Sequence, residues 1–322
     1  MEHSPPPVPL LLDADIGTNV DDSLALAYLL RNPRCELLGV TTVSGDVVKR
    51  AACAEVLCRE AGREDVQVHC GAPGPLLLGP GQAPVPLYAS ISHRPHRHHP
   101  TPGTAVEFLR SAIRRRPGEI TLLTIGPFTN VALLFALDPE MPSLLKAIVS
   151  MAGVYFPHER ATETNVLIDP VAAAMVFQAT ARQSSAPHTL FGLNVTTHCT
   201  LPAAEVRARL RAAIPPAPAL TEMAEAYFRR RRHVTLNDPL AAVAVFVPEV
   251  CTYEGGAVTM RADRLGEDVA RTYFAPGRAT PRASSNQRVA RGVRLERFFD
   301  EFFDTLRGVH TPGRFPLPAE GI

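Results

Sequence analysis

The chain has 322 residues, 46% of them hydrophobic, which is enough to bury the core of one large α/β domain. Its formal net charge of +1 gives no overall attraction to nucleic acid or to an anionic membrane, and no uncharged apolar run reaches the roughly 18 residues that a membrane-spanning helix needs. Six cysteines without a CxxC pair, and a start without the basic and apolar regions of a signal peptide, lead us to expect a soluble, cytoplasmic protein with reduced, buried cysteines.

The first predicted elements form a β-α-β unit. Residues 10–12 are an apolar run typical of a short buried strand, and residues 22–30 carry the apolar spacing of a helix, which Asn32 and Pro33 end. Residues 35–43 predict a second strand. Two strands joined by one helix pair in parallel, and the loops at the carboxyl ends of such strands hold the ligand in this class of sheet.

The alternation of strands and helices continues, and it predicts an α/β fold that is Rossmann-like, with a mostly parallel central sheet flanked by helices and with additional C-terminal helices. We expect a single domain over residues 1–322. The further strands are expected over residues 66–69, 120–125, 147–151 and 189–195, and the further helices over residues 51–61, 104–115, 170–179, 203–213, 218–230, 239–246 and 295–306. Polar stretches and stretches rich in Gly and Pro are predicted as mobile lid loops over the site, at residues 71–103, 225–235 and 276–288.

Four aspartates fall within ten residues directly after the first strand: Asp13, Asp15, Asp21 and Asp22. Carboxylates held together in a partly buried place raise one another's pKa unless a positive charge offsets the repulsion, and no Lys or Arg lies between the first and the last of them. The cluster therefore indicates a cation site, and its hard oxygen ligands favour Ca²⁺ or Mg²⁺ over zinc. A loop that uses Asp only for turns and helix capping is the alternative.

Four segments in order resemble the inosine-uridine-preferring nucleoside hydrolase family, over residues 10 to about 307. Residues 13–26 (DADIGTNVDDSLAL) are similar to the longer form of the family's DxDxGxDDAxAL signature. Residues 125–130 (IGPFTN), 163–170 (ETNVLIDP) and 237–241 (NDPLA) resemble its GPLTN, EFNxxxDP and HDPLA segments. The resemblance implies a nucleosidase, an enzyme that hydrolyses the N-glycosidic bond of ribonucleosides to ribose and free base.

The family's metal site carries over residue by residue. The resemblance implies Ca²⁺ held by Asp15, Asp22, the backbone carbonyl of Thr129 and Asp238, with a water and the ribose 2′- and 3′-hydroxyls as the remaining ligands. It also implies that Asp15 is the general base toward that water, which attacks C1′ through an oxocarbenium-like transition state with inversion.

The ribose contacts of the family carry over in the same way. Asp21 would accept from the 2′-hydroxyl, Asn165 would bind the 3′-hydroxyl, and Glu163 would bind the 5′-hydroxyl. Asp46 stands where the family has Asn after a Gly-Asn turn; a carboxylate there can still accept from a hydroxyl, but it adds negative charge.

The largest departures from the family concern the leaving group. Asn237 stands in the catalytic segment where some members have a His, and an amide cannot protonate a leaving base. The candidates for the acid are therefore His233 and His93, the second of which lies in the His-rich segment 92–99. That segment has two other interpretations, which are a solvated surface loop and a zinc site.

The side chains that would stack on the nucleobase also differ from those of the family, because the chain has no Trp. This removes the stacking arrangement of the family's purine-specific branch and favours pyrimidine or mixed nucleosides. Tyr227 and Phe274 are the candidate stacking partners.

Two other functions fit parts of the pattern. A DxD after a first strand also opens the haloacid-dehalogenase-type Mg²⁺ phosphatases, but those have Thr or Val where this chain has Gly17. The second is a catalytically altered nucleoside-binding or ribose-binding sensor of the same fold. A binding protein would not need both a general base and a full set of ribose contacts, and this argues against the sensor.

The arginine runs 114–116 and 229–232 are typical of solvated helix ends. We therefore expect a small-molecule nucleoside as partner, no nucleic acid, no membrane, and a homodimer or homotetramer as in relatives.

Overall fold

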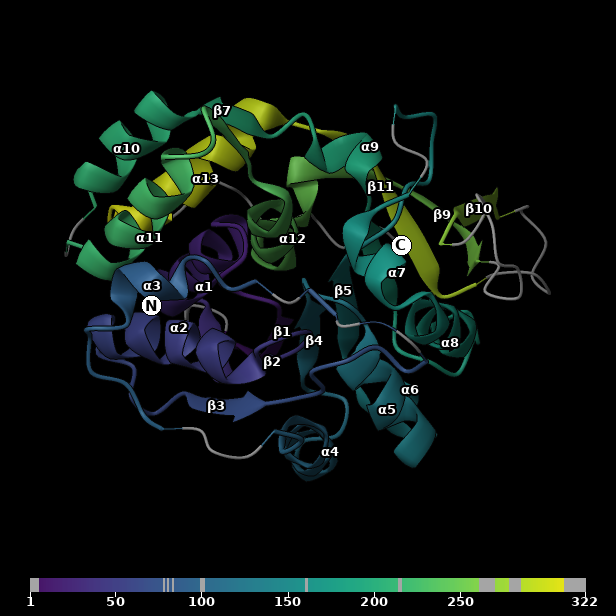
Figure 1. The fold of residues 1–322 in the computed structure, drawn as a ribbon. Coiled ribbons are helices and arrows are strands. Elements are labelled where there is room, and N and C mark those ends of the chain that lie inside the picture. Colours follow the sequence, from purple (N-terminus) through teal and green to yellow (C-terminus); the bar gives the residue numbers. More distant parts are fainter. Residues whose placement is uncertain are drawn as a thin grey trace, which may run out of the picture.

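The computed structural model describes residues 6–77, 79, 81–82, 84–98, 102–159, 162–213, 216–260, 270–277 and 285–309. A nine-stranded sheet forms its centre, with the strands in the order β10-β9-β11-β6-β5-β4-β1-β2-β3 (Figure 1). The strands are β1 (Val8–Ala14), β2 (Cys35–Thr42), β3 (Gln67–Cys70), β4 (Thr121–Thr124), β5 (Ala147–Met151), β6 (His188–Phe191), β9 (Cys251–Met260), β10 (Thr272–Pro276) and β11 (Gln287–Val293). From β11 to β3 all neighbours are parallel, whereas β9 is antiparallel to both β11 and β10. The predicted fold class is confirmed.

Helices cover both faces of the sheet (Figure 1). On one face lie α1 (Asp21–Arg31), α2 (Val47–Glu60) and α12 (Asn237–Phe246), with α10 (Ala203–Arg211), α11 (Pro218–Phe228) and α13 (Leu295–Leu306) on the same side. On the other face lie α4 (Ala105–Arg115), α5 (Thr129–Leu137) and α8 (Pro170–Thr180). The short elements are α3 (Tyr88–Ile91), α6 (Met141–Leu144), α7 (Thr164–Ile168), α9 (Leu193–Thr196), the 3₁₀ turn η1 (Pro248–Val250) and a small sheet of β7 (Thr200–Pro202) and β8 (His233–Thr235).

The two helical layers explain the apolar sequence of β1. Leu10 and Leu12 belong to the hydrophobic core on one face, and Leu11 belongs to the core on the other face. A parallel strand covered on both sides is apolar at every position instead of at alternate ones. The six cysteines are buried free thiols, as predicted. No helix among the described residues is long and apolar enough to cross a membrane.

Several predicted boundaries shift, one of them because of a helix cap. The helix expected from residue 51 begins at Val47, because the Asp46 side chain accepts from the Lys49 amide and caps it. The strand expected over residues 189–195 is wrong at its end: β6 stops at Phe191, and α9 starts two residues later. Helix α5 had no predicted counterpart.

The region after α12 differs most from the prediction. Residues 251–260 form the long strand β9, which with β10 and β11 adds an antiparallel edge to the sheet. Gly255 and Gly256 interrupt the apolar alternation of β9, and this weakens the signal for a strand in the sequence.

The predicted lids are only partly loops. Residues 71–103 include α3, and residues 78, 80, 83 and 99–101 of that stretch lie outside the described residues. Residues 225–235 combine the end of α11 with β8. Of the third predicted lid, residue 276 ends β10 and residues 287–288 belong to β11, so these positions are strand; residues 278–284 lie outside the described part.

Candidate active site

A cavity of about 140 Å³ lies where the loops after β1, β4, β5 and β6 meet the N-terminus of α12. We call it the acidic pocket. The candidate residues that line it are Asp15, Asp21, Asp22, Glu163, Asn165, Asn237 and Asp238. Carboxyl ends of parallel strands are where ligands bind in open α/β sheets, so the cavity lies at the edge of the sheet that the sequence predicted.

Three carboxylates in this pocket face one another. Side-chain oxygens of Asp21, Asp22 and Asp238 all lie within 4.8 Å of one another, and all three residues are buried. Burial is the main cause that raises the pKa of Asp22 and Asp238 well above the usual value, and repulsion from the neighbouring carboxylates adds to it. Burial also raises the pKa of Asp21, to about 6. The Asp22 Oδ1 atom is buried without a hydrogen-bond partner among the described residues. Oxygen-only donors with an unused buried oxygen fit a hard divalent cation.

Asp15 follows β1 directly and is buried beside these three carboxylates. Burial raises its pKa, whereas the charge of Arg50 and a hydrogen bond with Asp22 lower it. The turn after β4 packs against its backbone, since a Cβ on Gly126 would lie 2.8 Å from the Asp15 nitrogen. Only glycine permits this approach. Asp15 is thus held where a carboxylate with a raised pKa can accept a proton.

Arg50, which the sequence analysis missed, is fully buried behind the pocket. Its guanidinium donates to the carbonyls of Ser44 (2.6 Å), Ile16 (3.0 Å) and Gln82 (2.6 Å), and also to that of Asp15. Its charge lowers the pKa of Asp15 and Asp22. The sequence pattern did not indicate this role, because Arg50 precedes the helix predicted over residues 51–61 and its partners Ile16 and Gln82 are distant in sequence.

Asp13 does not line the acidic pocket, but its hydrogen bonds connect elements next to it. Its carboxylate accepts from the Thr41 hydroxyl (2.5 Å) and from Asn130 Nδ2 (2.7 Å). Asn130 also donates to the Thr42 carbonyl (3.1 Å), so this pair ties β1, β2 and the start of α5 together. Burial raises the pKa of Asp13 to about 7.

Glu163 and Asn165 belong to the start of α7. The Glu163 carboxylate caps that helix by accepting from the amides of Asn165 (2.6 Å) and Val166 (3.1 Å). Burial nevertheless raises the pKa of Glu163 to about 7. Asn165 donates from Nδ2 to the carbonyls of Ile125 (2.9 Å) and Met151 (3.1 Å), which uses its donors and leaves its Oδ1 to accept.

Asn237 is the first residue of α12, and it lies against Asp21. Its Nδ2 donates to Asp21 Oδ2 at 2.9 Å, and this bond lowers the pKa of that carboxyl against the effect of burial. Its Oδ1 is buried without a hydrogen-bond partner in the described part of the chain. Asn237 therefore orients Asp21.

Thr129, whose carbonyl is a candidate metal ligand, begins α5 and is buried. Its hydroxyl donates to Asp169 Oδ2 at 2.7 Å, and Asp169 caps α8 by accepting from the Ala172 amide. Thr129 is not among the residues that line the acidic pocket.

Three other candidates lie outside the acidic pocket. Asp46 caps α2 and forms an ion pair with Lys49 (2.7 Å). His93 is 65% exposed, with its Nε2 3.7 Å from a carboxylate oxygen of Glu222, and His233 is an exposed residue of β8. His93 and His233, the two candidate acids, therefore do not line the acidic pocket.

The aromatic candidates separate as well. Tyr227 lines a second cavity of about 860 Å³ between α3 and α11, which shares Thr18 and Asn19 with the acidic pocket. Phe274 is in the outer strand β10, where its ring meets that of Phe156 at a centroid distance of 5.7 Å. Only Tyr227 adjoins the site.

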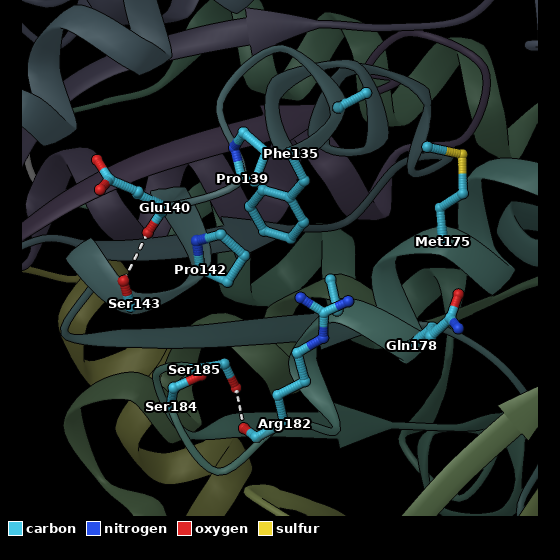
Figure 2. Close-up of a pocket in the computed structure, with 12 residues that line it drawn as sticks. Phe135, Pro139, Glu140, Pro142, Ser143, Met175, Gln178, Arg182, Ser184 and Ser185 are labelled. Carbon is cyan, nitrogen blue, oxygen red and sulfur yellow. Dashed lines mark hydrogen bonds between the residues drawn. The ribbon is translucent and has the colours of Figure 1, made fainter.

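A third hollow, of about 350 Å³, lies between α5, α6 and α8, and Figure 2 shows its lining. Its walls come from the C-terminal halves of α5 and α8, which lead toward the amino ends of the strands. Ser143 and Ser185 are hydrogen-bonded to the backbone of Glu140 and Arg182 (Figure 2). None of the candidate residues lines this hollow, so it is separate from the acidic pocket.

Comparison with protein families gives a match to the family described as inosine-uridine preferring nucleoside hydrolase, over residues 10–300. Among curated proteins, Uridine nucleosidase 1 of Arabidopsis thaliana is 32% identical over 83% of this chain and 82% of its own length. The pyrimidine-specific ribonucleoside hydrolase RihA of Klebsiella pneumoniae is 29% identical over 76% of this chain and 81% of its own length.

Solved structures agree with this. The purine-preferring ribonucleoside hydrolase from Gardnerella vaginalis superposes with a TM-score of 0.78 at 26% identity, covering 93% of this chain and 98% of that one. The inosine-uridine preferring nucleoside hydrolase from Bacillus anthracis, at 20% identity and a TM-score of 0.71, shares the fold. With its acidic pocket at the carboxyl ends of the sheet, the chain belongs to the inosine-uridine preferring nucleoside hydrolase family, whose members hydrolyse the N-glycosidic bond of ribonucleosides.

Proposed function

We propose that this chain is a Ca²⁺-dependent ribonucleoside hydrolase in which Asp15 is the general base. The observation that carries the proposal is the set of three buried carboxylates, Asp21, Asp22 and Asp238, with oxygens within 4.8 Å of one another. Their mutual repulsion disfavours the charged forms unless a cation offsets it.

The proposed ligands are Asp15, Asp22, the Thr129 carbonyl and Asp238. The unpartnered Oδ1 of Asp22 supports this set, as does the absence of thiolate or imidazole donors among the described residues that line the pocket. When bound, Ca²⁺ would supply the positive charge that lowers the pKa of the attacking water and orients the ribose hydroxyls. Asp21 belongs to the close set of three carboxylates because it directly precedes Asp22 in α1. We assign Asp21 to the ribose instead of the metal.

Asp15 is proposed to take the proton of the water that attacks C1′. Burial raises its pKa, and Arg50 limits that rise by donating to the Asp15 carbonyl and placing a positive charge nearby. A carboxylate whose pKa is raised in this way accepts a proton more readily than an ordinary one.

The ribose is proposed to bind through Asp21, Asn165 and Glu163. Each is buried and lines the acidic pocket, and each is fixed by its own hydrogen bonds: Asp21 by Asn237, Asn165 by two carbonyls, and Glu163 by backbone amides. Pre-oriented acceptors of this kind hold the sugar without reorganisation during the reaction. For Asp46, its role as helix cap supports no ribose contact.

We propose pyrimidine or mixed nucleosides as substrates. The chain has no Trp for purine stacking, and two curated relatives carry the names uridine nucleosidase and pyrimidine-specific ribonucleoside hydrolase. A homodimer or homotetramer and a cytoplasmic location stay predictions.

The Asp15→Asn variant tests this proposal, with ribose release from uridine and inosine as the readout. We expect turnover to fall by a factor of about 10³ or more, with an unchanged circular dichroism spectrum. Asp65→Asn is the matched control, because Asp65 is an exposed partner of Arg63 and does not line the acidic pocket, and we expect no change in rate. A rate for Asp15→Asn within a few-fold of the parent would refute the general-base role.

A further inference from the structure

Gln82 lines the acidic pocket, although no motif in the sequence pointed to it. It belongs to the segment between β3 and α3, whereas the residues assigned to the ribose come from the starts of α1 and α7. Its side-chain oxygen Oε1 is buried, and no residue in the described part of the chain donates a hydrogen bond to it. A buried amide oxygen without a donor is unfavourable, and this indicates that a ligand supplies the donor when it binds.

The backbone of Gln82 is fixed on both sides. Its amide donates to Ser44 Oγ at 2.6 Å, and its carbonyl accepts from Arg50 Nη2 at 2.6 Å. The preceding Gly81 has a φ of +67°, and a Cβ on it would lie 2.8 Å from the Pro73 carbonyl oxygen. Glycine is the residue that suits both this conformation and this close packing. Gln82 is therefore held by its main chain, and its side chain stays available.

Two of these contacts connect Gln82 to the catalytic part of the pocket. Arg50 also donates to the Asp15 carbonyl, so one buried cation holds both the proposed general base and Gln82. Ser44 belongs to the turn after β2 that precedes Asp46, and Asp46 itself caps α2 and does not line the pocket. The acceptor that the resemblance places after this turn is therefore available from Gln82 instead.

A neutral acceptor suits this pocket better than another carboxylate. Five of the residues that line it are Asp or Glu, and burial raises the pKa of each of them. A further negative charge would add to their mutual repulsion. The amide oxygen of Gln82 accepts a hydrogen bond without adding charge.

We propose that Gln82 is a substrate-binding residue whose Oε1 accepts a hydrogen bond from a hydroxyl of the sugar. This inference rests on the proposed ribohydrolase function and adds a residue to its binding site. Hydroxyls are the donors that a ribose brings into the pocket, and the ionised carboxylates of the lining accept hydrogen bonds but do not donate them.

Gln82→Met tests the contact, because methionine has a similar length and removes the acceptor while the backbone bonds to Ser44 and Arg50 remain. We expect KM for uridine to rise about fivefold with kcat reduced less, the effect of losing one neutral hydrogen bond. Stability toward urea should be unchanged or higher, because the variant loses a buried oxygen that has no partner in the free protein. Gln178→Met is the matched control: Gln178 is exposed on α8 and does not line the acidic pocket, so neither quantity should change.

Three deoxyuridines identify the hydroxyl. The 2′-, 3′- and 5′-deoxy compounds are measured as competitive inhibitors of ribose release from uridine, with the parent and with Gln82→Met. For the compound that lacks the bonded hydroxyl, the two proteins should have the same inhibition constant, because its contact is already lost. For the other two, the variant should bind about fivefold more weakly, as it does with uridine.

The remaining outcomes overturn the proposal. An unchanged KM for uridine, or a fivefold weaker inhibition constant for all three deoxyuridines, would exclude the sugar contact while ribose release upholds the hydrolase. A loss of stability equal to the loss of affinity would make Gln82 a structural residue. Calorimetry of Ca²⁺ binding without substrate should give the same affinity for both proteins, and a tenfold weaker affinity in the variant would make Gln82 a metal ligand instead. No ribose from uridine or inosine with the parent would overturn the proposed function, and the role of Gln82 with it.

Discussion

Asn237 donates a hydrogen bond from Nδ2 to Oδ2 of Asp21 at 2.9 Å, and so links the first turn of α12 to the first turn of α1. These helices carry Asp238 and Asp22, which face each other across the acidic pocket. The amide that stands where some family members have a histidine thus orients Asp21, the carboxylate that we propose binds the ribose.

Asn237→Ala should therefore affect substrate binding more than the chemical step. Loss of a hydrogen bond to a charged group costs about 1.5 kcal/mol, and we expect KM for uridine to rise about tenfold with kcat reduced less. Steady-state kinetics measure both. A fall in kcat with an unchanged KM would instead assign Asn237 to the leaving group.

Asp46→Ala distinguishes a helix cap from a ribose contact. Asp46 accepts from the Lys49 amide and lies outside the acidic pocket, so we expect a loss of about 1 kcal/mol in the free energy of unfolding and an unchanged KM. Urea unfolding and kinetics on the same preparation measure the two effects. A large rise in KM without loss of stability would restore the ribose contact that the resemblance implies.

Arg50→Met should destabilise the fold strongly, because it leaves several buried carbonyls and the Asp15 and Asp22 carboxylates without their buried cation. We expect a loss of about 3 kcal/mol or more in the free energy of unfolding. Arg59→Met is the control, since Arg59 forms only an exposed ion pair with Glu64 and should change stability by less than about 1 kcal/mol. Equal effects of the two substitutions would contradict the structural role of Arg50.

His188 predicts a specific dependence of stability on pH. Its ring lies between Ser150 Oγ (2.7 Å) and Thr180 Oγ1 (2.9 Å), and burial lowers its pKa to about 3. The unfolded chain therefore binds a proton below pH 6.5 that the folded chain does not, and stability falls as the pH drops from about 6.5 toward 3.

At pH 5 this term amounts to about 2 kcal/mol relative to pH 7. Chemical unfolding of the parent and of His188→Gln between pH 7 and 5 measures it, and the variant should lack this part of the slope. His198→Gln, at an exposed position, should keep the parental slope. Identical slopes for the parent and His188→Gln would show that His188 is not buried in its neutral form.

The parts of this molecule that were predictable depend on contacts close in sequence. The strand over residues 10–12, the helix after it and the acidic residues between them follow from local periodicity and charge, and the structure contains them. The antiparallel edge was not predictable, because Gly255 and Gly256 break the alternation of β9 and its partner β11 lies some thirty residues away.

The same distinction holds within the site. Asp15, Asp21 and Asp22 are close in sequence, and the family resemblance supplied Glu163, Asn165 and Asp238. The position of Arg50 depends on tertiary packing against the loop after β1, and no spacing rule indicates it. Asp46 was assigned from its place after a turn, whereas the first turn of α2 uses its carboxylate.

The most direct test is free ribose released from uridine and inosine by the protein after removal of divalent ions, before and after addition of Ca²⁺. Four buried carboxylates and their raised pKa values lead us to expect no ribose from the ion-free protein and full recovery with Ca²⁺, with protons released as the ion binds. Undiminished ribose release from the ion-free protein would contradict the proposed metal site at Asp15, Asp22 and Asp238.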